Sequence, residues 1–152
     1  MIVFRLSKAP FAHDLTGRGA ELAGGRWNSK GLPMLYTGAS RALCTAEVAV
    51  HTPLGILPKD FVIVEIEIPE DSMQAIELSE LPSNWREFPH LGSTKTIGDS
   101  FLKRNAFLVL KVPSAVVQGD YNYLVNLFHA DFQKVKIISK MTFEFDRRLF
   151  TR

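Results

Sequence analysis

The segment from Gly24 to His51 constrains the fold of this chain most strongly, because it predicts a turn, a strand, a second turn and a helix in succession. Ser40 is a residue type that caps helix N-termini, and RALCTAEVAVH then runs without glycine or proline until Pro53 follows. These residues predict a helix that ends at His51. The apolar run Pro33–Thr37, which glycines flank, predicts a buried strand before that helix.

Glu47 stands in the middle of this mostly apolar helix. An ionised carboxylate is costly to bury alone, so Glu47 either has a cationic or hydrogen-bonding partner or lines a cavity. His51 follows one turn later on the same helix face. The strand–turn–helix order brings Tyr36 and Glu47 to a common edge. Arg26 precedes the strand in a glycine-containing loop, where the glycines permit close approach to a ligand, although an ordinary turn is the favoured interpretation.

Length and composition predict one compact domain that spans residues 1–152, since 46% of the residues are hydrophobic. No stretch approaches a membrane span or a signal peptide, so we expect a cytoplasmic protein without membrane contact.

The single cysteine, Cys44, excludes an intramolecular disulfide and a cysteine-based zinc site, and its surroundings favour core packing. A net charge of +2 does not favour direct nucleic-acid binding. His129 and Asp131 lack further clustered ligands, so we expect a structural role and no metal site.

The remaining elements predict a mixed α/β (α+β) domain, without the strict βαβ alternation or the G-x-G-x-x-G turn of a Rossmann fold. A second helix is expected at Ser93–Asn105, a helix-poor segment at Ala9–Gly25, and a loop at Leu81–Gly92 that either borders a site or is a variable connection. Glu65 and Glu67 alternate on one strand, which is typical of a half-exposed sheet face. Strands are expected at Met1–Leu6, Pro33–Thr37, Asp60–Pro69, Met73–Leu78, Ala106–Val112, Val135–Ser139 and Met141–Phe145.

Several motifs occur in a defined order along the chain, namely GGRWN, LYT, AEVAVH, LKVPSAVV and a later H-x-D-F segment. In this order they resemble the RES-domain family, toxins of bacterial toxin–antitoxin pairs that are named for an Arg, a Glu and a Ser. Those residues correspond here to Arg26, Glu47 and Ser114. The resemblance spans nearly the whole chain and also places Arg5, in the first strand, in the active-site pocket. It implies a fold like that of ADP-ribosyltransferases, a split and strongly bent sheet with flanking helices and NAD bound in its cleft.

The resemblance implies cleavage of the nicotinamide–ribose bond of NAD, which passes through an oxocarbenium-like transition state and releases a neutral leaving group. Glu47 supplies negative charge beside the ribose, while Arg5 and Arg26 suit the pyrophosphate. Tyr36 supplies an aromatic surface and His51 a supporting role. Ser114 follows a proline and lacks a G-x-S-x-G elbow, so we expect its hydroxyl to hydrogen-bond the nicotinamide or ribose rather than to act as a nucleophile.

The acceptor stays open between water, inorganic phosphate and a protein, which correspond to an NADase, an NAD phosphorylase and an ADP-ribosyltransferase. NAD is then a substrate rather than a bound cofactor, with phosphate as the candidate co-substrate. A non-catalytic module that binds a nucleotide or a partner is the alternative from another class. The family also implies growth arrest by the toxin, a helix-turn-helix (Xre-type) antitoxin that blocks the cleft, and a homodimer. The sequence assigns no role to Arg18, Arg41, His90 or His129.

Overall fold

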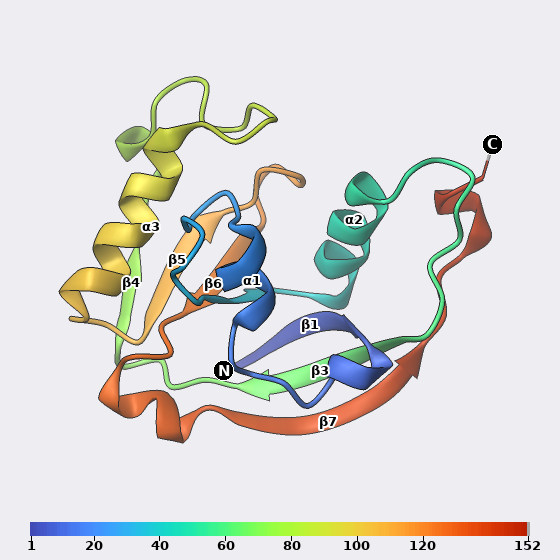
Figure 1. Ribbon diagram of the computed structural model, residues 1–152, viewed down its shortest axis with the longest axis horizontal. Coiled ribbons are helices and arrows are strands. Elements are labelled where there is room, and N and C mark those ends of the chain that lie inside the picture. Colours follow the sequence, from blue (N-terminus) through green and yellow to red (C-terminus); the bar gives the residue numbers. More distant parts are fainter. Residues whose placement is uncertain (152) are drawn as a thin grey trace.

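One mixed sheet contains all seven strands found in the computed structural model, which describes residues 1–151. Its order is β4-β5-β6-β2-β1-β3-β7, and only β4 and β5 pair in parallel. Figure 1 shows the arrangement. The strands are β1 (Ile2–Lys8), β2 (Leu35–Gly38), β3 (Phe61–Glu67), β4 (Met73–Ala75), β5 (Val109–Pro113), β6 (Tyr121–Val125) and β7 (Lys136–Phe143).

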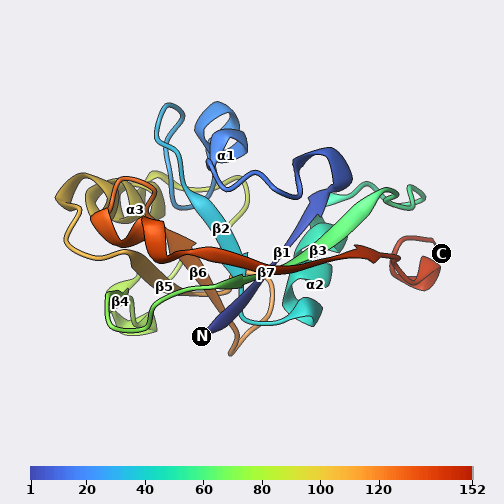
Figure 2. The ribbon, with the colours of Figure 1, turned by 90° about the horizontal axis from the view of Figure 1, so that it is seen from below.

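The sheet is bent where β1 meets β2. These two strands pair only at Phe4 and Gly38, whereas β1 pairs with β3 along its whole length, from Ile2 to Lys8. That narrow junction separates one half made of β4, β5, β6 and β2 from another made of β1, β3 and β7, which are turned relative to each other in Figure 1. Figure 2 shows β7 running beside β3 at the outer edge. The predicted mixed domain with a split, bent sheet is therefore confirmed.

Helix α2 (Arg41–His51) has the bounds that the sequence predicts. The Ser40 hydroxyl accepts a hydrogen bond from the Leu43 amide at 3.0 Å, as expected for an N-cap. Leu43 and Cys44 are buried against the sheet, and the Cys44 thiol donates to the Phe4 carbonyl oxygen at 3.3 Å. Burial raises the pKa of the Cys44 thiol to about 12, so the side chain acts as a small core residue, as the sequence predicts.

Helix α3 (Gly92–Arg104) covers the half of the sheet that contains β5 and β6. Phe101 and Leu102 on its inner face are buried in a cluster that also includes both tryptophans, Trp27 and Trp85. Gly98 on the same helix lies so close to the Trp27 backbone that a Cβ would stand 1.6 Å from its carbonyl oxygen. The packing of α3 therefore fixes the segment that carries Arg26.

Three elements differ from the sequence predictions. Residues 121–125 form a strand, β6, that was not predicted, although Tyr123, Leu124 and Val125 are buried. The two runs predicted at Val135–Ser139 and Met141–Phe145 form one strand, β7, because Lys140 continues the pairing with β3. The segment predicted to be helix-poor contains α1 (Arg18–Ala23), a short helix with a glycine at each end.

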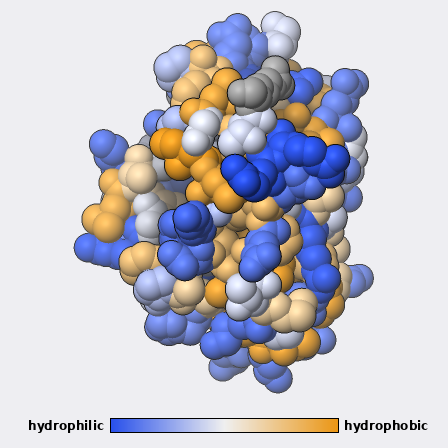
Figure 3. All heavy atoms as spheres, turned by 90° about the vertical axis from the view of Figure 1, so that its right-hand side faces the viewer, coloured by the Kyte–Doolittle hydropathy of each residue, from blue (hydrophilic) through white to orange (hydrophobic). Residues whose placement is uncertain are grey.

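Several charged residues form ion pairs on the surface or are exposed to solvent. These positions account for the residues without a functional role. Arg41 forms an ion pair with Glu65, Arg18 forms one with Glu21 at 2.9 Å, and Glu67 is exposed. The face that lies on the right of Figure 1 shows hydrophobic patches between hydrophilic ones in Figure 3. Of the helices in residues 1–151, none combines the length and the apolar character needed to cross a membrane.

Gly98→Ala tests how tightly α3 packs on the segment with Arg26. Alanine normally favours a helix over glycine by ~0.5–1 kcal/mol, but here the added methyl group collides with the Trp27 carbonyl oxygen. We expect a loss of ~1–3 kcal/mol or more in the free energy of unfolding, measured by urea denaturation. Gly92→Ala is the matched control, since nothing lies within 4 Å of its added Cβ. Equal stability of the two variants would contradict this packing.

Candidate active site

A cavity of about 800 Å³ opens between α1, α2, the segment after α1 and the loop that precedes α3. Its volume lies in the range of pockets that hold small-molecule ligands. Arg26, Tyr36, Glu47 and His51 all line it, so the structure brings together four of the six residues that the sequence singles out. The other residues in its wall are Gly19, Ala20, Gly24, Gly25, Trp27, Val50, Arg86, Phe88, His90, Ala115, Val116 and Asn122.

Glu47 has both a hydrogen-bonding partner and a cavity, the two alternatives that the sequence left open. The Asn122 side-chain amide donates to Glu47 Oε1 at 2.7 Å and also to the Thr37 carbonyl oxygen at 3.3 Å. Burial raises the pKa of Glu47, and the hydrogen bond from Asn122 opposes that shift. Asn122 therefore holds the carboxylate in place and favours its ionised form.

A second cavity of about 400 Å³ adjoins the first, and both walls contain Tyr36, Glu47 and His51. Arg5 lines this second cavity, where its Nη1 donates to the Asp14 carbonyl oxygen at 2.8 Å. Burial lowers the pKa of Arg5, although a guanidinium stays cationic at neutral pH. Arg5 and Arg26 thus belong to the two spaces that meet at Glu47.

Arg26 joins the cavity wall to the loop between Leu81 and Gly92. Its Nη1 donates to the carbonyl oxygens of Trp85, at 2.7 Å, and Glu87, at 3.1 Å. Burial lowers the pKa of Arg26 as well. In the part of the chain that the structure describes, its side-chain hydrogen bonds come from Nη1 alone, so Nε and Nη2 remain for a ligand.

Tyr36 is held by the segment that carries Arg26. Its hydroxyl donates to Asn28 Oδ1 at 2.6 Å and accepts from the Trp27 amide at 3.1 Å. Burial raises the pKa of this phenol far above its ordinary value, so it stays protonated. A Cβ at Gly25 would stand 2.6 Å from the Tyr36 hydroxyl oxygen. Gly25 is therefore required for a close approach, to Tyr36, and is more than an ordinary turn residue.

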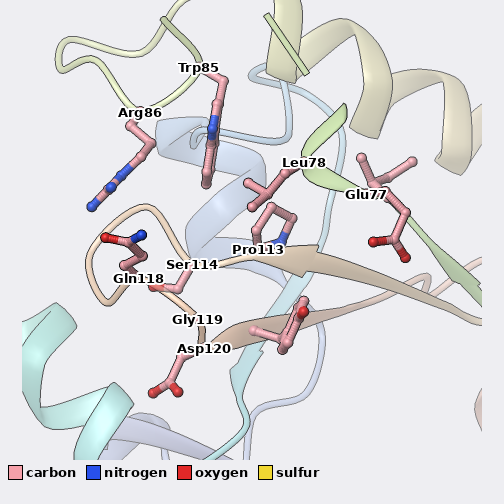
Figure 4. Close-up of a pocket in the computed structure, with 11 residues that line it drawn as sticks. Glu77, Leu78, Trp85, Arg86, Pro113, Ser114, Gln118, Gly119 and Asp120 are labelled. Atoms are coloured by element: carbon pink, nitrogen blue, oxygen red, sulfur yellow. The ribbon is translucent and has the colours of Figure 1, made fainter. Parts of the chain in front are cut away.

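Ser114 lies at the end of β5, as predicted, but outside the two cavities that contain Glu47. Its hydroxyl accepts hydrogen bonds from the amides of Val116, at 3.1 Å, and Val117, at 3.0 Å. The side chain is buried, with 3% exposed, and borders a smaller cavity of about 250 Å³, where Figure 4 shows it between Pro113 and Gln118. Ser114 thus shapes the turn whose next residue, Ala115, lines the large cavity.

The sequence did not single out Asn122, Arg86 or Phe88, and it assigned no role to His90. An asparagine in a strand and a phenylalanine in a loop carry no local signal, because what matters is the distant group that each contacts. The Leu81–Gly92 loop was predicted either to border a site or to be variable, and the structure shows the former. His90 lines the cavity, and burial lowers the pKa of its imidazole.

His129 and Asp131 lie in a turn away from this cavity. His129 Nδ1 accepts a hydrogen bond from the Asp131 amide at 3.1 Å, which caps a short 3₁₀ helix, Ala130–Lys134. Asp131 also pairs with Lys134 at 2.9 Å. These contacts agree with the predicted structural role. Within residues 1–151, no cluster of three or more His, Cys, Asp and Glu side chains offers a metal site.

The fold and the site define a class of protein, a mixed α/β domain with a bent sheet whose cleft holds a carboxylate and an arginine. The model of the RES domain matches residues 2–146. A "Toxin Res" of Photorhabdus laumondii is 33% identical over 151 residues, which cover 98% of this chain and 97% of that protein. A "Toxin Res" of Pseudomonas putida is 38% identical over 154 residues, covering 99% and 100% of the two chains. The chain therefore belongs to the RES domain family.

Two further comparisons concern another relative and a solved structure with a similar fold. A "Prs ADP-ribosylating toxin" of a Sphingobium strain is 33% identical over 144 residues, covering 93% of this chain and 89% of that protein. The fold is also similar to a chain in the crystal structure of the M. tuberculosis MbcT-MbcA toxin-antitoxin complex, with a TM-score of 0.74 and 18% identity. That match covers 98% of this chain and 86% of the other. At this identity the likeness establishes the fold.

Glu47→Gln tests the cost of the partly buried carboxylate. Burial raises the pKa of Glu47, so the folded protein binds this proton more tightly than the unfolded chain does. The resulting stability is complete below the ordinary glutamate pKa and is lost as the pH rises through the raised value. Glutamine is neutral throughout and keeps an oxygen for Asn122, so we expect the variant to be the more stable protein above that window and equally stable below it.

The measurement is thermal unfolding of both proteins from about pH 4 to about pH 8. Each kcal/mol gained corresponds to a rise of ~2–4 °C in Tm for a chain of this size. A variant that is no more stable than the wild type at the upper end would contradict the burial of an ionisable carboxylate.

Proposed function

We propose that this RES-domain toxin depletes NAD by cleaving its nicotinamide–ribose bond, with growth arrest as the consequence. The observation that carries the proposal is Glu47, a carboxylate held by Asn122 at 2.7 Å in the wall of a cavity of about 800 Å³. A structural carboxylate has no need of an open cavity, and its burial raises its pKa at a cost to stability. A role in binding or chemistry explains why such a group is present.

The chemistry suits a fixed negative charge. Breaking the bond between nicotinamide and ribose develops positive charge on the sugar, and a preorganised carboxylate stabilises that charge without rearrangement. The nicotinamide leaves as a neutral molecule, so the site needs no general acid. Asn122 serves this reaction by fixing the direction of Glu47 and by favouring its ionised form.

The two arginines supply the positive charge that a pyrophosphate requires. Arg26 lines the large cavity and Arg5 the adjoining one, and each is anchored to backbone carbonyl oxygens through Nη1. Anchoring fixes the guanidinium planes while other N–H groups remain for phosphate oxygens. Tyr36 stays protonated and lines both cavities.

Inorganic phosphate, water and a protein remain the candidate acceptors. An arginine in each of the two cavities that meet at Glu47 favours an anionic acceptor such as phosphate, opposite the arginine that binds the pyrophosphate. Transfer of ADP-ribose to a protein is the second candidate function, favoured by the "Prs ADP-ribosylating toxin" among the relatives. In this version the same cleavage occurs and only the acceptor differs.

The partners follow from the same comparisons. Because the structural neighbour is crystallised as a toxin-antitoxin complex, we propose an antitoxin that covers the cleft of this chain. A helix-turn-helix (Xre-type) antitoxin, a homodimer and a cytoplasmic location remain predictions.

NAD consumption by the purified chain, with and without inorganic phosphate, tests the function. We expect nicotinamide release, with a phosphorylated ADP-ribose if phosphate is the acceptor and free ADP-ribose if water is. Glu47→Gln should lower kcat by about 100-fold or more, because removal of one group that stabilises transition-state charge has effects of that order. A folded, antitoxin-free wild type that consumes no NAD under either condition would overturn NAD depletion.

Asn122→Ala tests how Glu47 is positioned. Removing the hydrogen bond leaves burial unopposed, so the pKa of Glu47 rises further. We expect kcat to fall by about 10-fold and the acid limb of the kcat/KM profile to move to higher pH. Thermal unfolding of the variant confirms that it is folded. A pH profile that keeps its wild-type acid limb would show that Asn122 does not act on Glu47.

A non-catalytic binding module predicts a different result. Glu47→Gln would then keep full toxicity in cells while it still bound the antitoxin. Loss of toxicity by a folded variant that retains antitoxin binding favours the enzyme.

A further inference from the structure

Phe88 is an exposed aromatic residue at the mouth of the large cavity. The side chain is 71% exposed, yet it lies between two imidazole rings, with centroids 6.2 Å from His51 and 5.2 Å from His90. All three residues line the cavity, and we call them the aromatic rim. Ligand pockets are lined mainly by apolar and aromatic side chains, so an exposed phenyl ring in the wall of this cavity suits contact with a ligand.

Four contacts fix the loop that carries Phe88. Arg26 donates to the carbonyl oxygens of Trp85 and Glu87, and the Trp85 ring packs 6.3 Å from Trp27. On the other side Arg86 Nε donates to the Ala115 carbonyl oxygen at 3.1 Å. The aromatic rim is therefore held in position before any ligand arrives, which reduces the entropy lost on binding.

In the aromatic rim, Phe88 and His51 are more exposed than Glu47, which lines the same cavity. His51 lies one helical turn after Glu47, and the Phe88 ring contacts the His51 ring at a centroid distance of 6.2 Å. A dinucleotide carries two planar bases joined by a pyrophosphate. When its reacting bond lies at Glu47 and its phosphates face Arg26, which lines the same cavity as Phe88, its second base reaches the mouth of that cavity.

We infer that the aromatic rim binds the adenine of NAD by stacking on Phe88, an inference that rests on the function proposed above. Adenine is uncharged and needs no ionic partner. This agrees with the aromatic rim, whose three residues include no carboxylate that would instead favour a cationic ligand. Burial and the nearby charges of Arg26, Lys95 and His51 lower the pKa of His90, so its imidazole is neutral at neutral pH. Phe88 thus sets specificity for the part of the substrate that does not react.

Two substrates, one with and one without an adenine, test whether Phe88 binds the adenine. Nicotinamide mononucleotide carries the scissile bond without the adenosine half, so it cannot reach Phe88. We expect Phe88→Ala to raise KM for NAD by roughly 10-fold or more, since stacking on an aromatic side chain has effects of this size, and to leave the kinetics of nicotinamide mononucleotide unchanged. Phe88→Tyr should restore the wild-type KM. Phe128→Ala is the matched control, because Phe128 is an exposed phenylalanine (56%) outside the cavity walls. This variant should leave the KM of both substrates unchanged.

The outcomes separate this inference from the proposed function. An unchanged KM for NAD in Phe88→Ala overturns it, and so do equal losses on both substrates, which would place Phe88 beside the nicotinamide half or in the support of the cavity.

If the wild type cleaves neither substrate, calorimetric titration with ADP-ribose still tests whether Phe88 binds the adenine. Weaker binding by Phe88→Ala than by Phe128→Ala supports the stacking site, and equal binding overturns it. If Phe88→Ala loses only affinity for the antitoxin while KM stays unchanged, Phe88 is a contact for a partner protein, and the adenine site is refuted.

Discussion

The hydrogen bond from Asn122 to Glu47 joins α2 to β6 in the wall of the large cavity, and the site depends on it. The Asn122 amide also reaches the Thr37 carbonyl oxygen, so one side chain links the helix to two neighbouring strands. Its place is set by the sheet, in which Asn122 pairs with Gly38, just before the turn that leads to α2. A carboxylate with this support keeps its orientation in a partly buried position, where an unsupported one would become protonated or turn toward solvent.

Glu47 also shows how function and stability oppose each other in this fold. The carboxylate lies between two cavities that contain Arg26 on one side and Arg5 on the other, and burial raises its pKa. Within residues 1–151 neither arginine forms an ion pair with it, and each donates through Nη1 to backbone carbonyl oxygens. The charges that face the cavities therefore remain available to a ligand. Such incompletely compensated groups are common at functional sites, where they lower stability.

Arg26 stabilises a loop in addition to its expected role in binding phosphate. The resemblance to the RES family gave it a role toward phosphate, and the structure shows that Nη1 of its guanidinium holds the loop with Trp85 and Glu87. Ser114 follows the same principle, since its hydroxyl accepts from two amides of the next turn. Both residues thus act on the shape of the cavity. A substitution at either position changes the loop as well as the site, so loss of activity alone would not prove contact with a substrate.

Local sequence patterns were sufficient to predict the elements around the site and to identify the family. The cap and length of α2, the strand before it and the core position of Cys44 follow from patterns that act within a few residues, and the ordered motifs identified the RES domain. Strand β6 and the continuity of β7 were missed, since both depend on pairing with distant strands. Only the tertiary structure decided the partners of the site residues. Glu47 meets Asn122 from 75 residues away and Arg26 meets Trp85 from 59, because strand register and helix packing, rather than local sequence, determine which distant side chains come into contact.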